Sequence, residues 1–499
     1  MFPPRFPFLG LLMLYVVLVW ALRSFGVTGG SIDDAEQLLY SQSWAWAYSA
    51  HNPPGPTWIV RALQSLTGPD LLSVTVPKFG WWLVSFLALY ACARRLFAAR
   101  AQAVHTTLWL AGVYYVSWEC VLNYSHSVQV LALSLLLLLQ LLRMRRQRAL
   151  GDYLLLGLLV ALGLVSKFNF AVLLLAMAGA SLWVPAYRQV ICDRRLLASM
   201  LVGLLVLTPV AFAQWQLLVA SPAATTAKFG IAPDWSWRLA LHGAGSALLA
   251  LASWLSPLLL FVLVLAPRVA LPLPALPPRT TPDGGCLQTD ERWLRAVGLG
   301  VLGLVIALTV ASRAAEARTH YFQIAAPLVL WLAVRVDLLG LGAARLRVIG
   351  VLCLTLALLS PLLLTLELTG LANITGKGRL LVPYAELAAA LRAEGFRDGL
   401  VVAQDWPHAL SGNLRPHLPA ARFFSLAHTD YRPPPARSAQ CLLLWQSASA
   451  PASVAQVLAL PGAFRQGTID LRPARGPQLA IHWALAETPQ PCQQLVAPP

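Results

Sequence analysis

The chain has 499 residues, of which 58% are apolar and 12% are charged, and its mean hydropathy is +0.65. Because soluble domains carry about 25% charged residues, this composition excludes an ordinary soluble protein and indicates an integral membrane protein. The formal net charge of +16 does not indicate a nucleic-acid partner, because Lys and Arg form no basic patch interleaved with aromatic residues.

Long apolar segments recur along the first three quarters of the chain. A transmembrane helix needs roughly 20 predominantly apolar residues, and we predict about eleven such spans. The first carries Arg23 late and lacks a clean small-x-small cleavage site, so we interpret it as a retained signal anchor. The predicted spans lie near residues 7–26, 79–97, 103–120, 127–142, 150–166, 168–186, 197–217, 243–266, 294–312, 321–336 and 347–370.

Positive charge alternates between the loops that join these spans. The positive-inside rule places the Arg-rich loops in the cytoplasm. The amino terminus is then inside and the tail outside, in agreement with an odd number of spans. The Arg-rich loops follow the second, fourth, sixth, eighth and tenth spans, and they contain Arg94, Arg95, Arg100, Arg143, Arg145, Arg146, Arg148, Arg188, Arg194, Arg195, Arg268, Arg279, Arg292, Arg345 and Arg347.

Apolar density falls after about residue 371. We therefore predict two domains, a transmembrane domain over residues 1–371 and a small α/β domain over 372–499 on the outer face. Cys441 and Cys492 lie in this tail, where they either form a disulfide or remain separate thiols. No Cys or Cys/His spacing indicates a zinc site. Within the tail, the pattern predicts a helix over Leu380–Glu394 and strands over 399–404, 421–426, 440–445 and 479–484.

An acidic cluster opens the first outer loop, about residues 27–78. Asp33, Asp34 and Glu36 lie within four positions, although acidic residues are scarce in this chain. Grouped carboxylates repel one another and lose solvation, so a bound cation, a hydrogen-bond donor or a catalytic task is expected to compensate. The alternative is a solvated helix start stabilised by the helix dipole. The same loop carries aromatic residues that suit either stacking on sugars or an interfacial belt: Tyr40, Trp44, Trp46, Tyr48 and Trp58.

Three further outer loops place polar residues on the same side of the membrane. Glu119 and His126 lie at the ends of adjacent spans. Lys167 occupies a tight turn between two apolar helices, where a cation is costly unless it reaches the headgroups or meets an anion. Arg318 and His320 lie in another outer loop, and an Arg side chain binds phosphate with a planar fork of donors.

Carboxylates, cations and aromatic side chains at headgroup depth suit one kind of chemistry. A group carried by a phosphate-linked membrane lipid is transferred to a hydroxyl on the same side. A carboxylate acts as the general base on that hydroxyl, and Lys and Arg stabilise the departing phosphate.

The order of several short motifs resembles a known family over nearly the whole chain. The acidic motif is Asp33-Asp34-Ala35-Glu36-Gln37, and Pro53-Pro54 with Trp58 follows it. This pattern resembles the GT-C glycosyltransferases of the protein O-mannosyltransferase and lipid A aminoarabinose transferase superfamily, and it is most similar to the bacterial branch that includes lipopolysaccharide-core galacturonosyltransferases. The other agreements are Trp118-Glu119, Ser125-His126-Ser127, Gly163-Leu164-Val165-Ser166-Lys167-Phe168-Asn169, Asp405 and Gly412-Asn413-Leu414-Arg415.

The resemblance implies a helical GT-C-like membrane bundle and an inverting transfer from a polyprenyl-phosphate sugar to a lipid, lipopolysaccharide or other glycan. The reaction is expected at the periplasmic face of a bacterial inner membrane. No catalytic metal is expected, although the three carboxylates provide a weak site for a divalent cation. Asn52 stands where the aminoarabinose transferases have a Lys. The expected site comprises Asp33 as base with Asp34 and Glu36, the donor-phosphate ligands Lys167, Arg318 and His320, and the substrate contacts Glu119, His126, Asn52 and Tyr48.

Two alternatives remain at this point. A surface-polysaccharide ligase or polymerase would use outer Arg and His residues, such as Arg318 and His320, on a pyrophosphate-linked oligosaccharide. A transporter of lipid-linked sugars would place its ionisable residues near the bilayer midplane, whereas here they gather at one face. The sequence leaves open which sugar and acceptor are used and the oligomeric state.

Overall fold

The computed structural model describes residues 7–123, 125–220, 234–274, 276–341, 343–369, 371, 379–406, 408–459, 464–473 and 478–496. The chain divides into two compact units. Unit 1 comprises Met1–Val16, His51–Pro53 and Gly80–Ser360, and unit 2 comprises Val17–Ala50, Pro54–Phe79 and Pro361–Pro499. Three long helices contribute residues to both units: α1 (Pro7–Phe25), α4 (Leu72–Leu96) and α17 (Ala343–Thr369).

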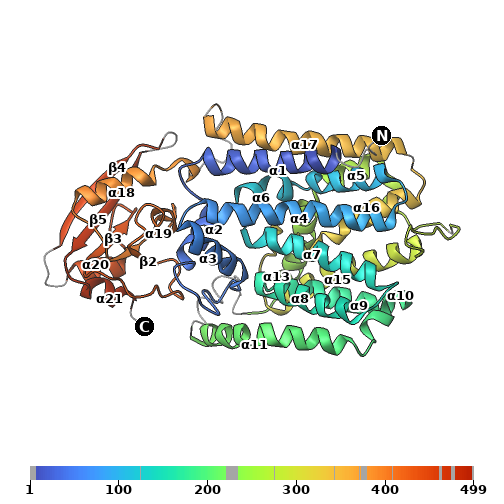
Figure 1. The fold of residues 1–499 in the computed structure, drawn as a ribbon, viewed down its shortest axis with the longest axis horizontal. Helices are drawn as coiled ribbons and strands as arrows, with labels where there is room; N and C mark the ends of the chain where they lie inside the picture. Colours follow the sequence, from blue (N-terminus) through green and yellow to red (C-terminus); the bar gives the residue numbers. More distant parts are fainter. Residues whose placement is uncertain are drawn as a thin grey trace. The chain divides into compact units, whose positions relative to one another are not determined.

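Unit 1 is a helical bundle, and many of its helices run in nearly the same direction (Figure 1). Helix α8 packs against α7 and α11, while α15 packs against α9, α13 and α16. Its other elements are α5 (Arg100–Trp109), η1 (Leu110–Gly112), η2 (Tyr115–Glu119), α6 (Cys120–Leu122), α7 (Ser125–Met144), α8 (Leu150–Ser166), α9 (Phe170–Trp183), α10 (Pro185–Ile191), α11 (Leu196–Ala220), α13 (Trp237–Leu255), α14 (Leu258–Leu265), η3 (Pro267–Ala270), α15 (Leu287–Ala311), η4 (Thr319–Ala325) and α16 (Pro327–Leu338).

Six helices within the described residues are long and apolar enough to cross a membrane: α1, α4, α7, α11, α15 and α17. The count rises to seven if the bent pair η4 and α16 forms one span. Other predicted spans correspond to shorter or interrupted helices. The segment expected over 243–266 is divided into α13 and α14 at Ser256-Pro257, for example, and α8 and α9 are apolar but short. The number of eleven spans and their orientation therefore remain predictions.

Unit 2 contains a five-stranded mixed sheet with the strand order β2-β1-β3-β5-β4. Strands β1, β2 and β3 are parallel, with Leu400 opposite both Arg422 and Cys441, and β5 runs antiparallel between β3 and β4. The elements of unit 2 are α2 (Ile32–Tyr40), α3 (Gly55–Thr67), η5 (Arg379–Leu381), α18 (Tyr384–Ala393), β1 (Leu400–Ala403), α19 (Leu410–Leu414), β2 (Arg422–Ser425), β3 (Cys441–Trp445), α20 (Ala452–Leu458), β4 (Arg465–Leu471), β5 (Leu479–Ala486) and α21 (Gln490–Val496).

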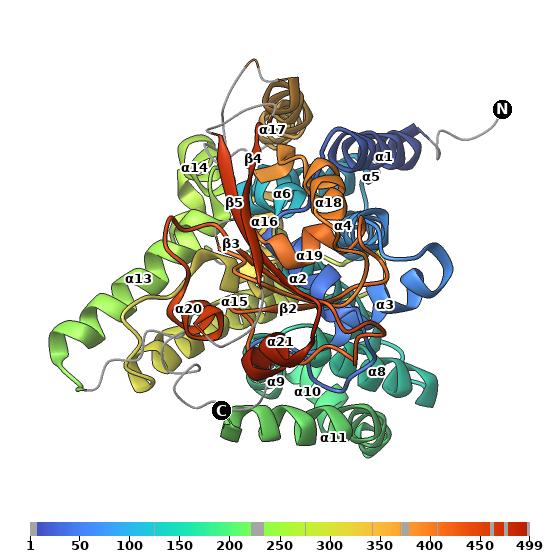
Figure 2. The same ribbon diagram turned by 90° about the vertical axis from the view of Figure 1, so that its left-hand side faces the viewer.

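The two faces of this sheet build two hydrophobic cores because successive strand residues point in opposite directions. Val401 and Leu442 pack with residues of α18, α19 and the acidic helix α2. Val402 and Leu443 pack on the other face with α20 and α21. Figure 2 shows the sheet nearly edge-on, with α18 and α19 on one side of it. Helix α2, far from the tail in sequence, thus belongs to the same core as the sheet.

Most of the predicted tail elements are present. The predicted helix and all four predicted strands coincide with α18, β1, β2, β3 and β5. Cys441 and Cys492 form a disulfide, which joins β3 to α21. The prediction missed strand β4, whose sequence Arg465–Leu471 is mostly polar and largely exposed at the sheet edge.

Candidate active site

The acidic cluster forms the first turns of helix α2, and a local capping box defines where this helix begins. Ser31 is the N-cap, and its Oγ accepts a hydrogen bond from the backbone N–H of Asp34 at 3.3 Å. The Asp34 carboxylate in turn accepts a hydrogen bond from the backbone N–H of Ser31 at 3.1 Å. This reciprocal arrangement satisfies two donors at a helix start.

The Asp34 carboxylate is fully buried between two cations. Arg23, near the end of α1, contributes an ion pair at 2.7 Å, and Lys78, in the second turn of α4, lies 3.4 Å away. Burial alone would raise the pKa of Asp34, but the charges of Lys78 and Arg23 and the hydrogen bonds from Ser31 lower it to about 2. Asp34 is therefore an ionised anchor that connects α2 to two long helices.

Asp33 and Glu36 differ from Asp34 because both side chains are only partly buried. An α-helix turns by about 100° per residue, so Asp33 and Asp34 lie on different faces of α2, and Glu36 lies about 60° from Asp33. The anchored Asp34 fixes the rotation of the helix about its axis. The positions of the two partly accessible carboxylates are thereby set.

Helix α19 of the tail packs backbone to backbone against α2 (Figures 1 and 2). A side chain at Gly412 would collide with the carbonyl group of Ala35 in the middle of α2. Asn413 accepts a hydrogen bond from the N–H of Gly30 at 2.7 Å and donates one to the Gly30 carbonyl at 3.4 Å. Glycine is needed where two backbones approach this closely.

Arg415 binds the other end of α2. Its side chain is 4% exposed and donates hydrogen bonds to the carbonyl oxygens of Leu38 and Ser41, to the Ser41 hydroxyl and to Gln64 of α3. These carbonyl groups at a helix end otherwise lack partners within the helix. The Gly412-Asn413-Leu414-Arg415 motif therefore holds α2 at its beginning, middle and end.

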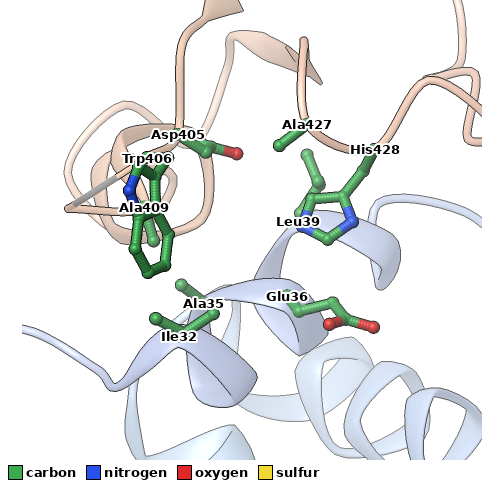
Figure 3. A pocket seen from close by; sticks show the side chains of 9 residues that line it. All are labelled: Ile32, Ala35, Glu36, Leu39, Asp405, Trp406, Ala409, Ala427 and His428. Atoms are coloured by element: carbon green, nitrogen blue, oxygen red, sulfur yellow. The ribbon is translucent and has the colours of Figure 1, made fainter. Parts of the chain in front are cut away.

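A cavity lies between α2 and two loops of the tail (Figure 3). The two loops follow the carboxyl ends of the parallel strands β1 and β2. Figure 3 shows the Trp406 ring at one side and the His428 imidazole at the other, with α2 forming the floor. The lining residues are Ile32, Ala35, Glu36, Leu39, Asp405, Trp406, Ala409, Ala427 and His428.

The polar side chains of this cavity are held by neighbouring groups. The Tyr40 hydroxyl lies 3.0 Å from Nδ1 of His428. Burial, with the nearby charge of Glu36, raises the pKa of Tyr40 well above its usual range, so this hydroxyl keeps its proton and forms a hydrogen bond with the imidazole. The Asp405 carboxylate accepts hydrogen bonds from the N–H and the hydroxyl of Ser411 and thereby caps the start of α19.

In unit 1, the predicted phosphate ligand Lys167 ends helix α8. Its Nζ donates a hydrogen bond to Ser127 Oγ at 2.8 Å and lies 3.5 Å from the carbonyl oxygen of His320. The amide of Asn169 donates to the carbonyl oxygen of Tyr321 at 2.7 Å. The turn after α8 is thus bound to η4 and to the start of α7, which brings Lys167 next to the His320 segment.

The other predicted residues of unit 1 lie in different settings. Glu119 accepts a hydrogen bond from the Tyr114 hydroxyl at 2.9 Å, and His126 is buried at the start of α7. Arg318 is exposed at the beginning of η4. The backbone carbonyl of Asn52 accepts a hydrogen bond from Gln214 at 3.3 Å. These contacts leave the proposed substrate roles of the four residues as predictions.

Tyr48, predicted as a substrate contact, belongs to unit 2 and is 2% exposed. Its hydroxyl donates to the Ser43 carbonyl at 2.8 Å and accepts from the Ala45 N–H at 3.1 Å. Its ring stacks on Tyr40 with centroids 5.8 Å apart. This environment favours a packing role for Tyr48 over a direct contact with substrate.

Sequence reasoning did not identify the partners of the acidic helix. Arg23 enters the sequence analysis only as a late residue of the signal anchor, and no local pattern distinguishes Lys78, Trp406 or His428. The spacing of Ser31 and Asp34 is a capping-box pattern that predicts the helix start. No group of three or more His, Cys, Asp and Glu side chains within the described ranges is arranged to hold a metal ion, and Asp34 is already committed to two cations.

Comparisons with known proteins agree with this architecture. Residues 51–212 match the family model described as dolichyl-phosphate-mannose-protein mannosyltransferase. The chain is 31% identical over 199 residues to the lipopolysaccharide core galacturonosyltransferase RgtA of Rhizobium johnstonii, a match that spans 40% of each chain. It is 26% identical over 441 residues to RgtB, a lipopolysaccharide core galacturonosyltransferase of the same organism, which covers 87% of this chain and 86% of the relative.

The fold is shared with a protein of known structure. The crystal structure of ArnT from Cupriavidus metallidurans bound to undecaprenyl phosphate aligns with a TM-score of 0.61 and 15% sequence identity, over 95% of this chain and 97% of that one. The apo form of the same protein aligns with a TM-score of 0.57. At this identity the likeness establishes the common fold, and the sequence matches to RgtA and RgtB connect it with glycosyl transfer.

Proposed function

We propose that this chain, which resembles the GT-C glycosyltransferases, moves a monosaccharide from a polyprenyl-phosphate donor to a lipid, lipopolysaccharide or other glycan acceptor. The observation that carries this proposal is the anchored acidic helix α2. Asp34 is fixed by Arg23 and Lys78, so that Asp33 and Glu36 are held in place while remaining partly accessible. Fixed carboxylates beside an acceptor hydroxyl are what general-base catalysis requires.

Asp33 is the base in this proposal. The acceptor oxygen attacks the anomeric carbon of the donor sugar while Asp33 takes the hydroxyl proton. The bond between the anomeric carbon and the phosphate oxygen breaks, and the phosphate leaves with the electron pair, so the configuration at the anomeric carbon is inverted. Glu36 supports the acceptor, and Asp34 serves as a positioning residue because its carboxylate is occupied by two cations.

Lys167, Arg318 and His320 are the proposed ligands of the donor phosphate. Lys167 and His320 lie together at the turn after α8, and the exposed Arg318 precedes His320 by two residues. A cation near the leaving phosphate stabilises the charge that develops there. The crystal structure of ArnT with undecaprenyl phosphate bound supports a donor of this class.

The reaction is proposed to occur at the periplasmic face of a bacterial inner membrane. The disulfide between Cys441 and Cys492 supports an oxidising compartment for the tail, because disulfides are rare where thiols are kept reduced. Helix α2 packs in the same core as the tail sheet, so both lie on one side. The positive-inside rule, which assigns the Arg-rich loops to the cytoplasm, also supports an outer location for the tail.

The test is transfer of radiolabelled sugar from an undecaprenyl-phosphate donor in membranes that contain the full chain. We expect Asp33→Asn to lower the rate by about 100-fold or more, since general-base catalysis contributes about this much, with unchanged protein level. Asp470→Asn, at an exposed position of β4, is the matched control and should retain full activity. Near-normal transfer by Asp33→Asn would overturn the assignment of the base.

A further inference from the structure

We propose that the cavity between α2 and the tail is the acceptor subsite, and that it binds an uncharged, hydroxyl-rich sugar ring. The inference rests on the proposed glycosyl transfer and deepens it by assigning the tail a direct part in acceptor recognition. The lining comes from both segments: Ile32, Ala35, Glu36 and Leu39 from α2, and Asp405, Trp406, Ala409, Ala427 and His428 from the tail.

The cavity lies where mixed and parallel sheets commonly bind ligands. Asp405 and Trp406 follow β1, and Ala427 and His428 follow β2, at the carboxyl ends of two adjacent parallel strands. Loops at this edge are positioned by the rigid sheet, while their side chains vary without disturbing the core. Here the edge faces the catalytic helix, as Figure 3 shows.

Trp406 provides a stacking surface for a sugar. Its side chain is 63% exposed although it lines the cavity, and burying an indole ring on a ligand recovers a large apolar area. The adjoining floor is apolar and is formed by Ile32, Ala35 and Ala409. An aromatic ring beside a small apolar floor matches the C–H face of a pyranose.

Hydrogen-bonding groups stand opposite this surface. The hydrogen bond between the Tyr40 hydroxyl and Nδ1 of His428 orients the imidazole, and Nε2 donates or accepts a hydrogen bond according to the tautomer. Glu36, at the same cavity, is an acceptor. An imidazole nitrogen and a carboxylate across from an aromatic ring can bind adjacent sugar hydroxyls, because a hydroxyl both donates and accepts hydrogen bonds.

The charge of the lining selects against anions. Glu36 and Asp405 contribute carboxylates, and the part of the lining that the structure describes includes neither Lys nor Arg. A phosphate or a sugar acid in this cavity would face like charges without a compensating cation. The donor phosphate therefore belongs elsewhere, and the ring bound here carries no carboxylate.

The cavity faces a side of α2 that is close to the proposed base, Asp33. Ile32, Ala35, Glu36 and Leu39 occupy one face of α2, and Asp33 is about 100° from Ile32 around the helix axis. Glu36 lies at the edge of that face nearest to Asp33, about 60° from it. An acceptor ring seated against Trp406 can thus present a hydroxyl towards Asp33 from the side of the tail, and the donor approaches from another side, as an inverting displacement demands.

The experiment uses the full-length protein in nanodiscs, with undecaprenyl-phosphate galacturonate as donor and lipopolysaccharide from a strain that lacks this protein as acceptor. We expect Trp406→Ala to raise the acceptor KM by about 5- to 10-fold, the loss expected for one aromatic contact, with an unchanged donor KM. Trp406→Phe keeps an aromatic face and should restore most of the acceptor affinity. Trp237→Ala removes an exposed indole of α13 that does not line the cavity and should change neither constant.

Direct binding separates failure of this inference from failure of the proposed function. Surface plasmon resonance with the same lipopolysaccharide should show weaker binding to Trp406→Ala and to His428→Ala than to the wild type, whether or not turnover occurs. Equal binding and an equal acceptor KM in Trp406→Ala would overturn the acceptor subsite while transfer by the wild type stands. A wild type that binds lipopolysaccharide in a Trp406-dependent manner but transfers no sugar would overturn the proposed donor and leave the subsite supported.

Discussion

The acidic helix of unit 2 and the lysine turn of unit 1 are held by different kinds of contact. In α2, Asp34 meets the charges of Arg23 and Lys78, and the helix end meets Arg415. At the turn after α8, Lys167 donates to a hydroxyl and approaches a carbonyl, oxygens that carry no charge of their own. Breaking a buried ion pair costs about 3–5 kcal/mol, whereas losing a hydrogen bond from a charged donor to a hydroxyl costs about 1.5–3 kcal/mol. Loss of the ion pairs that anchor α2 should therefore affect folding more than replacement of Lys167 does.

The largest effect is expected from Asp34→Asn. The variant leaves Arg23 and Lys78 buried without their anion, and breaking a buried pair in this way costs about 3–5 kcal/mol. The melting temperature of the purified protein in detergent should fall markedly, while exposed Asp470→Asn should leave it unchanged. An unaltered melting temperature for Asp34→Asn would show that α2 is not anchored through this carboxylate.

Gly412→Ala tests the contact of α19 with α2. The added methyl group meets the Ala35 carbonyl, and because backbone must move to accommodate it, we expect a loss of up to about 3 kcal/mol in stability. Transfer activity should fall as well, since α2 is displaced. Gly179→Ala, where an added Cβ meets nothing within 4 Å, is the matched control, and equal melting temperatures for the two variants would contradict the close packing.

The pH dependence of stability should report the same anchor. The pKa of Asp34 in the folded protein is about 2, below the value of about 3.9 for an unfolded chain. Its contribution of about 2 kcal/mol is therefore fully present above pH 4 and is lost as the pH falls towards 2. Thermal unfolding of the wild type across this range should show the loss, and the decline should be shallower in Asp34→Asn, which has no carboxylate to protonate at this position.

These contrasts also explain which parts of the molecule the sequence can predict. Hydropathy located α8 and α11 closely, and alternation located β1 and β3, because both signals arise within a short window. The same windows do not register interruptions such as the one between α13 and α14. Strand β4 was missed because it lies at the sheet edge and is partly exposed, so its sequence is mostly polar.

The candidate site was predicted only in part for a similar reason. The acidic cluster was found because three carboxylates are adjacent in the chain. The contacts that distinguish Asp34 from Asp33 come from Arg23 and Lys78, which lie 11 and 44 positions away from Asp34. Gly412 packs on Ala35, which is far away in the sequence. A close approach of two such backbones cannot be predicted from local periodicity.

Lys167→Ala tests the role of the turn after α8. We expect the affinity for undecaprenyl phosphate to fall by about tenfold, the loss of one charged contact of roughly 1.4 kcal/mol, with less effect on the acceptor. The melting temperature should fall less than in Asp34→Asn. Binding measured by native mass spectrometry checks this, with Arg292→Ala, an exposed cation of α15, as control. If donor binding is unchanged, the phosphate is held elsewhere, and Arg318 is the next residue to replace.

The smallest effect is expected from Tyr48→Phe, which decides between packing and substrate contact. The Tyr48 hydroxyl bonds to Ser43 and Ala45 within its own loop, so its removal should lower stability by about 1 kcal/mol. The KM values for donor and acceptor should stay the same, because the ring still stacks on Tyr40. A raised acceptor KM without a loss of stability would instead make Tyr48 a substrate contact. It would also show that the loop opens during the reaction, because a side chain that is 2% exposed cannot otherwise reach a sugar.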